Sequence, residues 1–175
     1  MVSKPDILAI FIGGLGFDQT QDIRLAATRV AGIQIATAGT DNGYKTDVHL
    51  YPMLYPSKSI AIIAHSFGCQ TALAACIALA EENLWVDYLA LIDPVSHDPL
   101  WASSMSMPPA GVTPLSTDIF NATNSFPVRR AMIIGGNPPI VVSGTHNSIC
   151  HEGELISRIM GELNTLFTVD FTATA

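Results

Sequence analysis

Short apolar runs, each about the length of a strand, alternate along the chain with longer segments in which apolar residues recur at helical spacing. The run at 59–64 contains Ile60, Ile62 and Ile63, and its continuous apolar character is typical of a strand buried on both faces. We expect strands at 6–12, 33–37, 59–64, 86–92, 129–134 and 140–143, and helices at 18–30, 67–82 and 149–167. This alternation predicts βαβ units and an α/β fold with three layers (α/β/α) around a mostly parallel sheet.

Three segments do not fit the alternation. Residues 41–56 are ambiguous and hold at most a short helix. Residues 96–127 contain five prolines, so we expect a long irregular loop there, either a lid over a site or a plain crossover. Residues 135–139 are too few for a parallel crossover, so the last two strands are expected to pair as a hairpin unless the second is an extended arm.

The composition describes an apolar-rich globular chain. Its 175 residues are 49% hydrophobic and 13% charged, and no repeat or linker divides them, so we expect a single domain over 1–175. The formal net charge is −7, and Arg129 and Arg130 are the only adjacent basic pair, which argues against a nucleic-acid partner. No apolar stretch is long enough to span a bilayer, and no signal peptide is expected.

The three cysteines are Cys69, Cys76 and Cys150, an odd number that cannot pair completely. Cys69 and Cys76 lie seven positions apart in an alanine-rich helical segment, so both fit one buried face. We expect three reduced thiols in the core and therefore a cytoplasmic protein. His146 and His151 do not have the spacing of a helical zinc site, and no metal or organic cofactor is expected.

The strongest local motif is Ala64-His65-Ser66-Phe67-Gly68, between an apolar strand and an alanine-rich helix. A serine on such a strand-to-helix turn needs small residues two positions before and after it, so that the two elements can approach. Ala64 and Gly68 meet this need. We expect Ser66 to have a strained backbone and to present its hydroxyl at the carboxyl end of the sheet, where the N-terminus of the helix favours developing negative charge.

With this turn the chain resembles the α/β-hydrolase superfamily, whose motif is Gly-x-Ser-x-Gly, with Ala64 in place of the first glycine. The resemblance extends from the first expected strand to the last expected helix, and it is to small lipase-like, esterase-like and thioesterase-like members. It implies a minimal form of that fold, lacking the first two strands of larger members, with Ser66 as the nucleophile.

The first expected strand is followed by Gly-Gly-Leu-Gly at 13–16. In the resembled family a glycine turn at this place supplies one backbone N–H of the oxyanion hole, and the residue after the nucleophile supplies the other. The resemblance therefore implies Leu15 and Phe67 as the donors. A nucleotide-binding loop is the competing interpretation, but Gln19 stands where the third glycine of a GxGxxG motif belongs.

Five histidines are present, and the resembled fold takes its general base from a loop after the last strand. His146 lies in such a position, before a helix that Asn147 or Ser148 can cap. His151 falls within the first helical turn and is the second candidate. His65 adjoins the nucleophile, but its side chain is expected to point away from it.

The acid that orients this histidine follows one of two late strands in the resembled family. No carboxylate follows the strand that ends at 134. The fourth expected strand leads into Leu-Ile-Asp-Pro, which is similar to the acid-bearing turn of pancreatic-type lipases and of some thioesterase domains. We assign Asp93, with Asp98 as the second candidate and Asp118 as the third. The order Ser66, Asp93, His146 is the order of the resembled fold.

These residues predict a serine hydrolase that cleaves a small-molecule carboxylic ester or thioester through an acyl-enzyme. Three apolar side chains of the 96–127 segment are candidates for the substrate pocket: Trp101, Met105 and Met107. Two alternatives stay open. One is an acyltransferase that uses the same triad, and the other is a non-catalytic member of the fold that binds a ligand or a partner in the pocket.

Overall fold

The computed structural model describes residues 6–14, 19–38, 51–57, 59–96, 104–125 and 130–167. Within these residues six strands form one sheet in the order β2-β1-β3-β4-β6-β8, and every neighbouring pair is parallel. The strands are β1 (Ile7–Ile12), β2 (Ile33–Ala38), β3 (Ser59–His65), β4 (Tyr88–Ile92), β6 (Ser116–Asn124) and β8 (Ile140–Thr145). The predicted α/β class with a mostly parallel sheet is confirmed.

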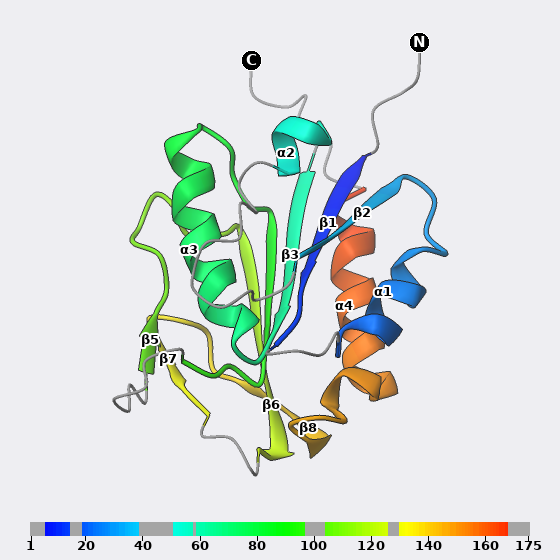
Figure 1. Cartoon of the computed structure of the whole chain (residues 1–175), viewed down its shortest axis with the longest axis vertical. Helices are drawn as coiled ribbons and strands as arrows, with labels where there is room; N and C mark the ends of the chain where they lie inside the picture. Colours follow the sequence, from blue (N-terminus) through cyan, green and yellow to red (C-terminus); the bar gives the residue numbers. More distant parts are fainter. Residues whose placement is uncertain are drawn as a thin grey trace.

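Helices cover both faces of this sheet (Figure 1). α3 (Gly68–Glu81) lies on one face, where Tyr51 of the short α2 (Tyr51–Leu54) also packs against the core. α1 (Gln21–Ala27) and α4 (Gly153–Thr165) lie side by side on the other face. The three predicted layers are therefore present.

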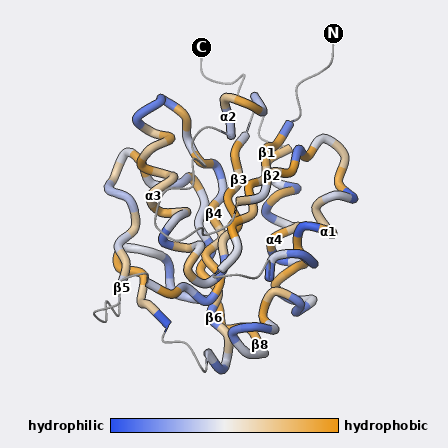
Figure 2. Tube along the Cα trace, in the orientation of Figure 1, coloured by the Kyte–Doolittle hydropathy of each residue, from blue (hydrophilic) through white to orange (hydrophobic). Residues whose placement is uncertain are grey.

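Successive residues of a strand point to opposite faces of a sheet, and β1 shows how two cores result. Leu8, Ile10 and Ile12 pack into the core under α3, and the residues between them pack into the core under α1 and α4. All six residues of β1 are buried, and Figure 2 shows the central strands in the colours of hydrophobic residues. Burial on both faces explains the continuous apolar runs from which these strands were predicted.

The prediction of a long irregular loop over 96–127 is wrong for residues 104–106, which form the short strand β5, and for residues 116–124. Residues 116–124 form β6, which lies between β4 and β8 in the large sheet. Polar residues interrupt the apolar pattern of this strand, so the sequence does not indicate it. One of them, Asp118, is charged and forms an ion pair with Arg158 of α4. The prolines at 108, 109 and 114 precede the strand and do not interrupt it.

The prediction that the last two strands form a hairpin is also wrong. β7 (Met132–Ile134) pairs in parallel with β5 (Ser104–Ser106) in a small second sheet, whereas β8 pairs in parallel with β6. Residues 135–139 carry the chain from one sheet to the other, and Gly135 turns it with a φ of +78°. The error follows from the missing β6, because without that strand β7 is the only neighbour left for β8.

Two helical segments differ from their predicted bounds. α1 ends at Ala27, before the predicted end at residue 30, and Gly32 lies further along with a φ of +83°, before β2. The C-terminal segment is not continuous, because a 3-10 turn, η2 (Ile149–His151), is followed by Glu152 in an extended conformation and only then by α4. η2 contacts both β8 and α4, so it joins the sheet to the last helix.

The cysteines are core residues, as predicted. Cys69 and Cys76 are free thiols on the buried side of α3, and Cys150 is buried on the opposite face of the sheet. Burial raises the pKa of Cys76 to about 12 and that of Cys69 further, so these two thiols are unreactive near neutral pH. Among the described residues, no helix has the length and apolarity needed to cross a membrane, and no three side chains gather as a metal site.

Candidate active site

The turn between β3 and α3 places Ser66 in the strained conformation that its motif predicts. Its φ is +58°, in the left-handed region that residues with a Cβ rarely adopt. Hydrogen bonds hold it there, because the Ser66 N–H donates to the Ile92 carbonyl at 2.9 Å, and its own carbonyl accepts from Cys69 and Val95 at 3.1 Å each. The turn is thus fastened to both the helix and the neighbouring strand.

Gly68, two residues after Ser66, lies against the backbone at the end of β1. A Cβ added at this position would lie 2.7 Å from the carbonyl oxygens of both Ile12 and Gly13. These oxygens belong to backbone that cannot move without shifting β1. The need for a small residue at this position of the motif is therefore a direct steric one.

Replacing Gly68 by alanine is expected to lower the free energy of unfolding by about 1–3 kcal/mol, because the added methyl group overpacks a backbone contact. Gly161 of α4 is the matched control, since a Cβ added there meets nothing within 4 Å. Its replacement by alanine is expected to raise stability by roughly 0.5–1 kcal/mol. Urea denaturation measures both changes, and a Gly68→Ala protein as stable as the wild type would contradict the steric argument.

A second strained turn carries Asp93, directly after β4. Its φ is +41°, and its backbone N–H donates to the carbonyl of Phe120 in β6 at 2.7 Å. β3 and β4 are parallel neighbours, so Ser66 and Asp93 both follow the carboxyl ends of adjacent strands. The topology alone brings the two side chains to the same edge of the sheet.

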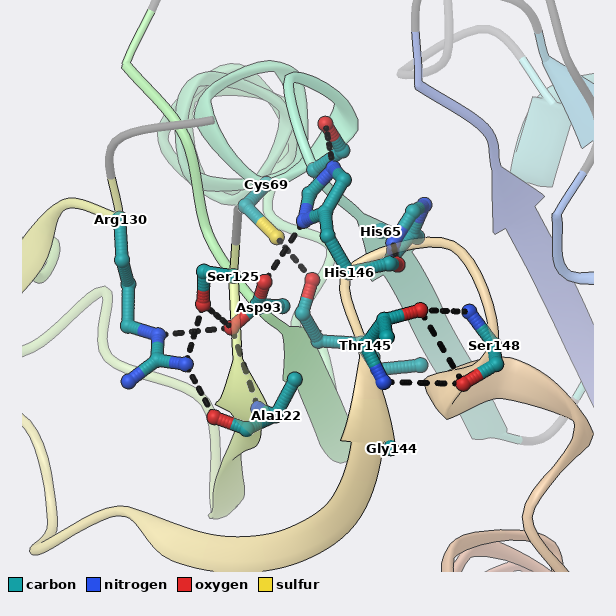
Figure 3. A network of polar contacts seen from close by, with 12 residues as sticks. His65, Cys69, Asp93, Ala122, Ser125, Arg130, Gly144, Thr145, His146 and Ser148 are labelled. Atoms are coloured by element: carbon teal, nitrogen blue, oxygen red, sulfur yellow. Dashed lines mark hydrogen bonds and ion pairs between the residues drawn. The ribbon is translucent and has the colours of Figure 1, made fainter. Parts of the chain in front are cut away.

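His146, on the loop after β8, lies beside Asp93 (Figure 3), and its other ring nitrogen faces Ser66. Its Nε2 lies 2.9 Å from Ser66 Oγ, and its Nδ1 lies 2.6 Å from Asp93 Oδ2. All three residues are buried, with exposed fractions of 4% for Ser66, 4% for His146 and 0% for Asp93. The sequence predicted these three residues together, and the structure brings them into one hydrogen-bonded chain.

The two hydrogen bonds of His146 determine which ring nitrogen carries the proton when the imidazole is neutral. An ionised Asp93 can only accept, so Nδ1–H is the donor to Oδ2. Nε2 is then unprotonated and accepts the hydroxyl proton of Ser66. This is the tautomer in which an imidazole can act as a general base toward the serine.

The loop of His146 is held at several points. The His146 N–H donates to the carbonyl of Asn124 in β6 at 2.9 Å. Ser148 does not cap the following 3-10 turn with its side chain. Instead its Oγ accepts the N–H of Thr145 at 2.9 Å, which closes the loop on either side of the histidine (Figure 3).

Asp93 is ionised although it is fully buried. Burial by itself raises the pKa of this carboxyl, but hydrogen bonds from His146, Ser125 and Arg130 outweigh it and lower the pKa to about 2. The backbone N–H of Ala122 is a further donor to Oδ1, at 3.1 Å. The carboxylate is therefore charged throughout the physiological pH range.

The pKa of Asp93 predicts an acid-dependent loss of stability. Because this pKa is lower in the folded protein than the ordinary value of 3.8, the stabilisation is complete above that value and is lost as the pH falls toward about 2. Urea unfolding at pH values from about 5 to about 2.5 measures the loss. The free energy of unfolding is expected to change less steeply with pH in Asp93→Asn than in the wild type. Equal slopes in the two proteins would contradict the lowered pKa of Asp93.

His65 packs against His146, a contact that no local pattern in the sequence indicates. Its ring centroid lies 4.7 Å from that of His146, and its Nε2–H donates to the His146 carbonyl at 2.9 Å. Burial, and then the proximity of His146, lower the pKa of His65 to about 4, so the ring is neutral near pH 7. A neutral ring at this place would not repel a positive charge on His146. The one feature of the sequence that could have placed His65 at this site is its position as the last residue of β3, directly before Ser66.

The oxyanion positions are described in part. Leu15 lies outside the described residues. Phe67 immediately precedes α3, so its backbone lies at the N-terminal end of that helix. Gly14 lies against Ser66, since a Cβ added there would be 3.2 Å from Ser66 Oγ. Gly14, in the described part of the glycine segment, therefore adjoins the serine.

The remaining candidates lie elsewhere or outside the described residues. Asp118 points to Arg158 and to the hydroxyl of Tyr88, and His151 is exposed and paired with Asp22 at 2.8 Å. Asp98 and Trp101 lie outside the described residues. Met105 is buried in the core under α3, and Met107 packs against the same core. The assignment of these methionines to a substrate pocket stays a prediction.

Solved structures with similar folds include three proteins that align over most of their length. The type II thioesterase YbtT from the yersiniabactin NRPS/PKS biosynthetic pathway is 11% identical, with a TM-score of 0.56 over 95% of this chain and 96% of the other. The type II thioesterase BorB from the borrelidin biosynthetic cluster is 10% identical, with a TM-score of 0.57 over 90% and 93%. A CIB-like hydrolase from Thermoplasma acidophilum is 15% identical, with a TM-score of 0.55 over 97% and 89%.

At such low identities these similarities establish the fold, and the described part of the chain has the fold of the α/β hydrolases. No protein-family model matches the sequence, and no curated protein matches it.

Proposed function

We propose that this protein is a serine hydrolase that cleaves a thioester or a carboxylic ester through an acyl-enzyme. One observation carries the proposal: the hydroxyl of Ser66, the imidazole of His146 and the carboxylate of Asp93 form a continuous buried chain with distances of 2.9 and 2.6 Å. A hydroxyl is a weak nucleophile until a base takes its proton. Here the base is in contact with it and is held in the required tautomer.

In the first half-reaction, Ser66 Oγ attacks the substrate carbonyl carbon while its proton passes to Nε2 of His146. Asp93 stabilises the resulting imidazolium through the hydrogen bond at Nδ1. When the tetrahedral intermediate collapses, the bond to the leaving thiolate or alkoxide breaks, and that group takes the proton from Nε2. The acyl group remains on Ser66 as an ester.

In the second half-reaction, water attacks the acyl-enzyme and gives a proton to Nε2. Collapse of this second intermediate releases the carboxylic acid and returns the proton to Ser66 Oγ. In both intermediates the oxyanion is proposed to accept hydrogen bonds from the backbone N–H groups of Phe67 and Leu15. The position of Phe67 at the N-terminal end of α3 favours negative charge there.

The structural neighbours favour thioesters as the first substrates to test. Several carry the word thioesterase in their names, among them YbtT, BorB and the thioesterase domain of surfactin synthesis, which is 14% identical with a TM-score of 0.56. For this chain we therefore propose a small-molecule acyl thioester as the substrate class, with carboxylic esters as the alternative.

The test is covalent labelling with a fluorophosphonate, which reacts with an activated serine and mimics the tetrahedral intermediate. We expect one phosphonyl group per chain, located on Ser66 by peptide mass spectrometry, together with release of thiol from acyl thioesters. Ser66→Ala is expected to take up no label. A wild-type protein that is neither labelled nor active would contradict the proposal and favour the non-catalytic alternative.

An acyltransferase would pass the same labelling test, so the products decide between the two reactions. We expect the free carboxylic acid to be the main product when a thioester is turned over in the presence of added alcohols or amines. Accumulation of the transferred ester or amide in preference to the acid would identify an acyltransferase instead.

A further inference from the structure

The carboxylate of Asp93 has more partners than the orientation of one histidine requires. Oδ2 accepts from His146 alone. Oδ1 accepts three hydrogen bonds, from Arg130 Nε at 2.7 Å, from Ser125 Oγ at 2.8 Å and from the N–H of Ala122 at 3.1 Å. The two oxygens are thus divided between the imidazole on one side and a cluster centred on Arg130 on the other (Figure 3).

Arg130 is held in this position by its backbone and by its side chain. The N–H of the next residue, Ala131, donates to the carbonyl of Pro94 at 2.7 Å, which fastens this segment beside the Asp93 turn. Nη2 of Arg130 donates to the Ala122 carbonyl and to Ser125 Oγ. The guanidinium therefore bridges the acid to the end of β6, and its side chain is only 29% exposed.

The position of the charge matters as much as the contacts. A carboxylate without solvent exposure favours its protonated form unless charged or polar donors compensate the loss of water. Arg130 forms an ion pair with Asp93 on the side that faces away from His146. It can therefore stabilise the ionised acid without competing for the oxygen that the imidazole uses.

We propose that Arg130 is a positioning residue for the reaction, which fixes the Asp93 carboxylate in its ionised, aligned form so that Oδ2 holds His146 toward Ser66. This inference rests on the proposed function. Arg130 does not touch the reacting atoms, and it acts through Asp93. The adjacent basic pair at 129–130 thus includes a residue of the site, although nothing in the sequence connects it with Asp93.

A small cavity adjoins Arg130 and makes a chemical test of this role accessible. It has a volume of about 220 Å³ and is bounded by Arg130, the β7 segment and the side chains of Ile119 and Asn121 on β6. Truncation of Arg130 to alanine enlarges this space beside Asp93. A free guanidinium ion matches the planar group that was removed and can occupy the vacated position.

Arg130→Met removes the charge while keeping much of the side-chain volume. We expect kcat to fall about tenfold to a hundredfold, the scale of a catalytic group that is misplaced rather than removed, with KM changed less than about threefold. Arg130→Lys, which retains the charge without the planar fork, is expected to recover part of kcat. Millimolar guanidinium is expected to raise the kcat of Arg130→Ala, whereas urea and sodium chloride are not.

The pH profile separates this role from a structural one. Among the described residues, the titratable and charged groups around Asp93 are His146, Arg130, the buried thiol of Cys69 and His65. Removal of a positive charge makes protonation of this group of residues easier, so the acid limb of kcat/KM is expected to move up by about one pH unit in Arg130→Met. Loss of a purely structural contact would lower thermal stability without moving this limb.

Arg158 provides the matched control. Like Arg130, it pairs with an aspartate of low exposure, Asp118, but that pair lies away from the triad. Arg158→Met is expected to change stability only, with kcat and the acid limb unchanged. If Arg130→Met has a kcat within twofold of the wild type and the same acid limb, the inference is wrong.

A measurement without turnover keeps this inference separate from the proposed function. In carbon-13 NMR titrations, with the Asp93 resonance assigned by its loss in Asp93→Asn, the carboxyl is expected to titrate at higher pH in Arg130→Met than in the wild type. Equal midpoints would overturn the role of Arg130 even in an active enzyme. If the wild type is neither labelled nor active, but the titration midpoint of Asp93 is shifted in Arg130→Met, the proposed function is wrong and the coupling of Arg130 to Asp93 is supported.

Discussion

Replacing Ser66 by alanine is expected to lower kcat on an acyl thioester by about 10⁶-fold, the scale found when the nucleophile of a hydrolytic triad is removed. The alanine leaves no oxygen 2.9 Å from Nε2 of His146, so no acyl-enzyme can form. The fold is expected to survive, because the backbone hydrogen bonds of residue 66 to Ile92, Cys69 and Val95 do not involve its side chain. Steady-state kinetics and circular dichroism measure the two effects.

The cooperative action of the triad gives this prediction a sharper form. His146→Ala is expected to cost about as much as Ser66→Ala, and the double variant no more than either one, because each single change already disables the same step. His151→Ala is the control, since that histidine is exposed and pairs with Asp22 away from the nucleophile. Losses that add in the double variant, or residual activity near the wild-type rate in either single variant, would exclude a shared proton-transfer step.

The fold was predictable from the sequence wherever a strand is buried on both faces. β1, β3 and β4 are continuous apolar runs because helices cover each side of them. β6 was not predictable by the same rule, since Asp118 and Asn121 interrupt its apolar residues. Only tertiary contacts, such as the ion pair of Asp118 with Arg158, make such a sequence stable inside the sheet. That one omission also led to the wrong pairing of β7 and β8.

The residues of the candidate site also differ in how far the sequence predicts them. Ser66 could be located because the turn it occupies restricts its neighbours to small residues, as the close approach at Gly68 shows. Asp93 and His146 could be assigned from chain order and from the strands that precede them. Arg130 and His65 could not, since each contacts a partner more than thirty residues away through side-chain geometry alone. The turn at Ser66 therefore leaves a local signal in the sequence, whereas side-chain contacts between distant residues leave none.

Replacing Asp93 by asparagine is expected to lower kcat by about 10⁴-fold, although the change in shape is minimal. Oδ1 accepts hydrogen bonds from Ala122, Ser125 and Arg130. These three donors need an oxygen, so the amide group of the asparagine must take the position of Oδ2, which faces His146. The N–H of this amide then donates to Nδ1 of His146, and the ring proton moves to Nε2. A protonated Nε2 can no longer accept the proton of Ser66.

Asp118→Asn is the matched control for this tautomer argument, because Asp118 also pairs with an arginine but contacts no histidine in the described structure. It is expected to keep kcat within about twofold of the wild type while losing some stability. In Asp93→Asn, nitrogen-15 NMR of the imidazole is expected to show the proton on Nε2 of His146 instead of Nδ1. An Asp93→Asn protein that retains the Nδ1–H tautomer and more than about a hundredth of the wild-type kcat would remove Asp93 from the triad, since the mechanism requires a carboxylate at this position to hold the base toward the serine.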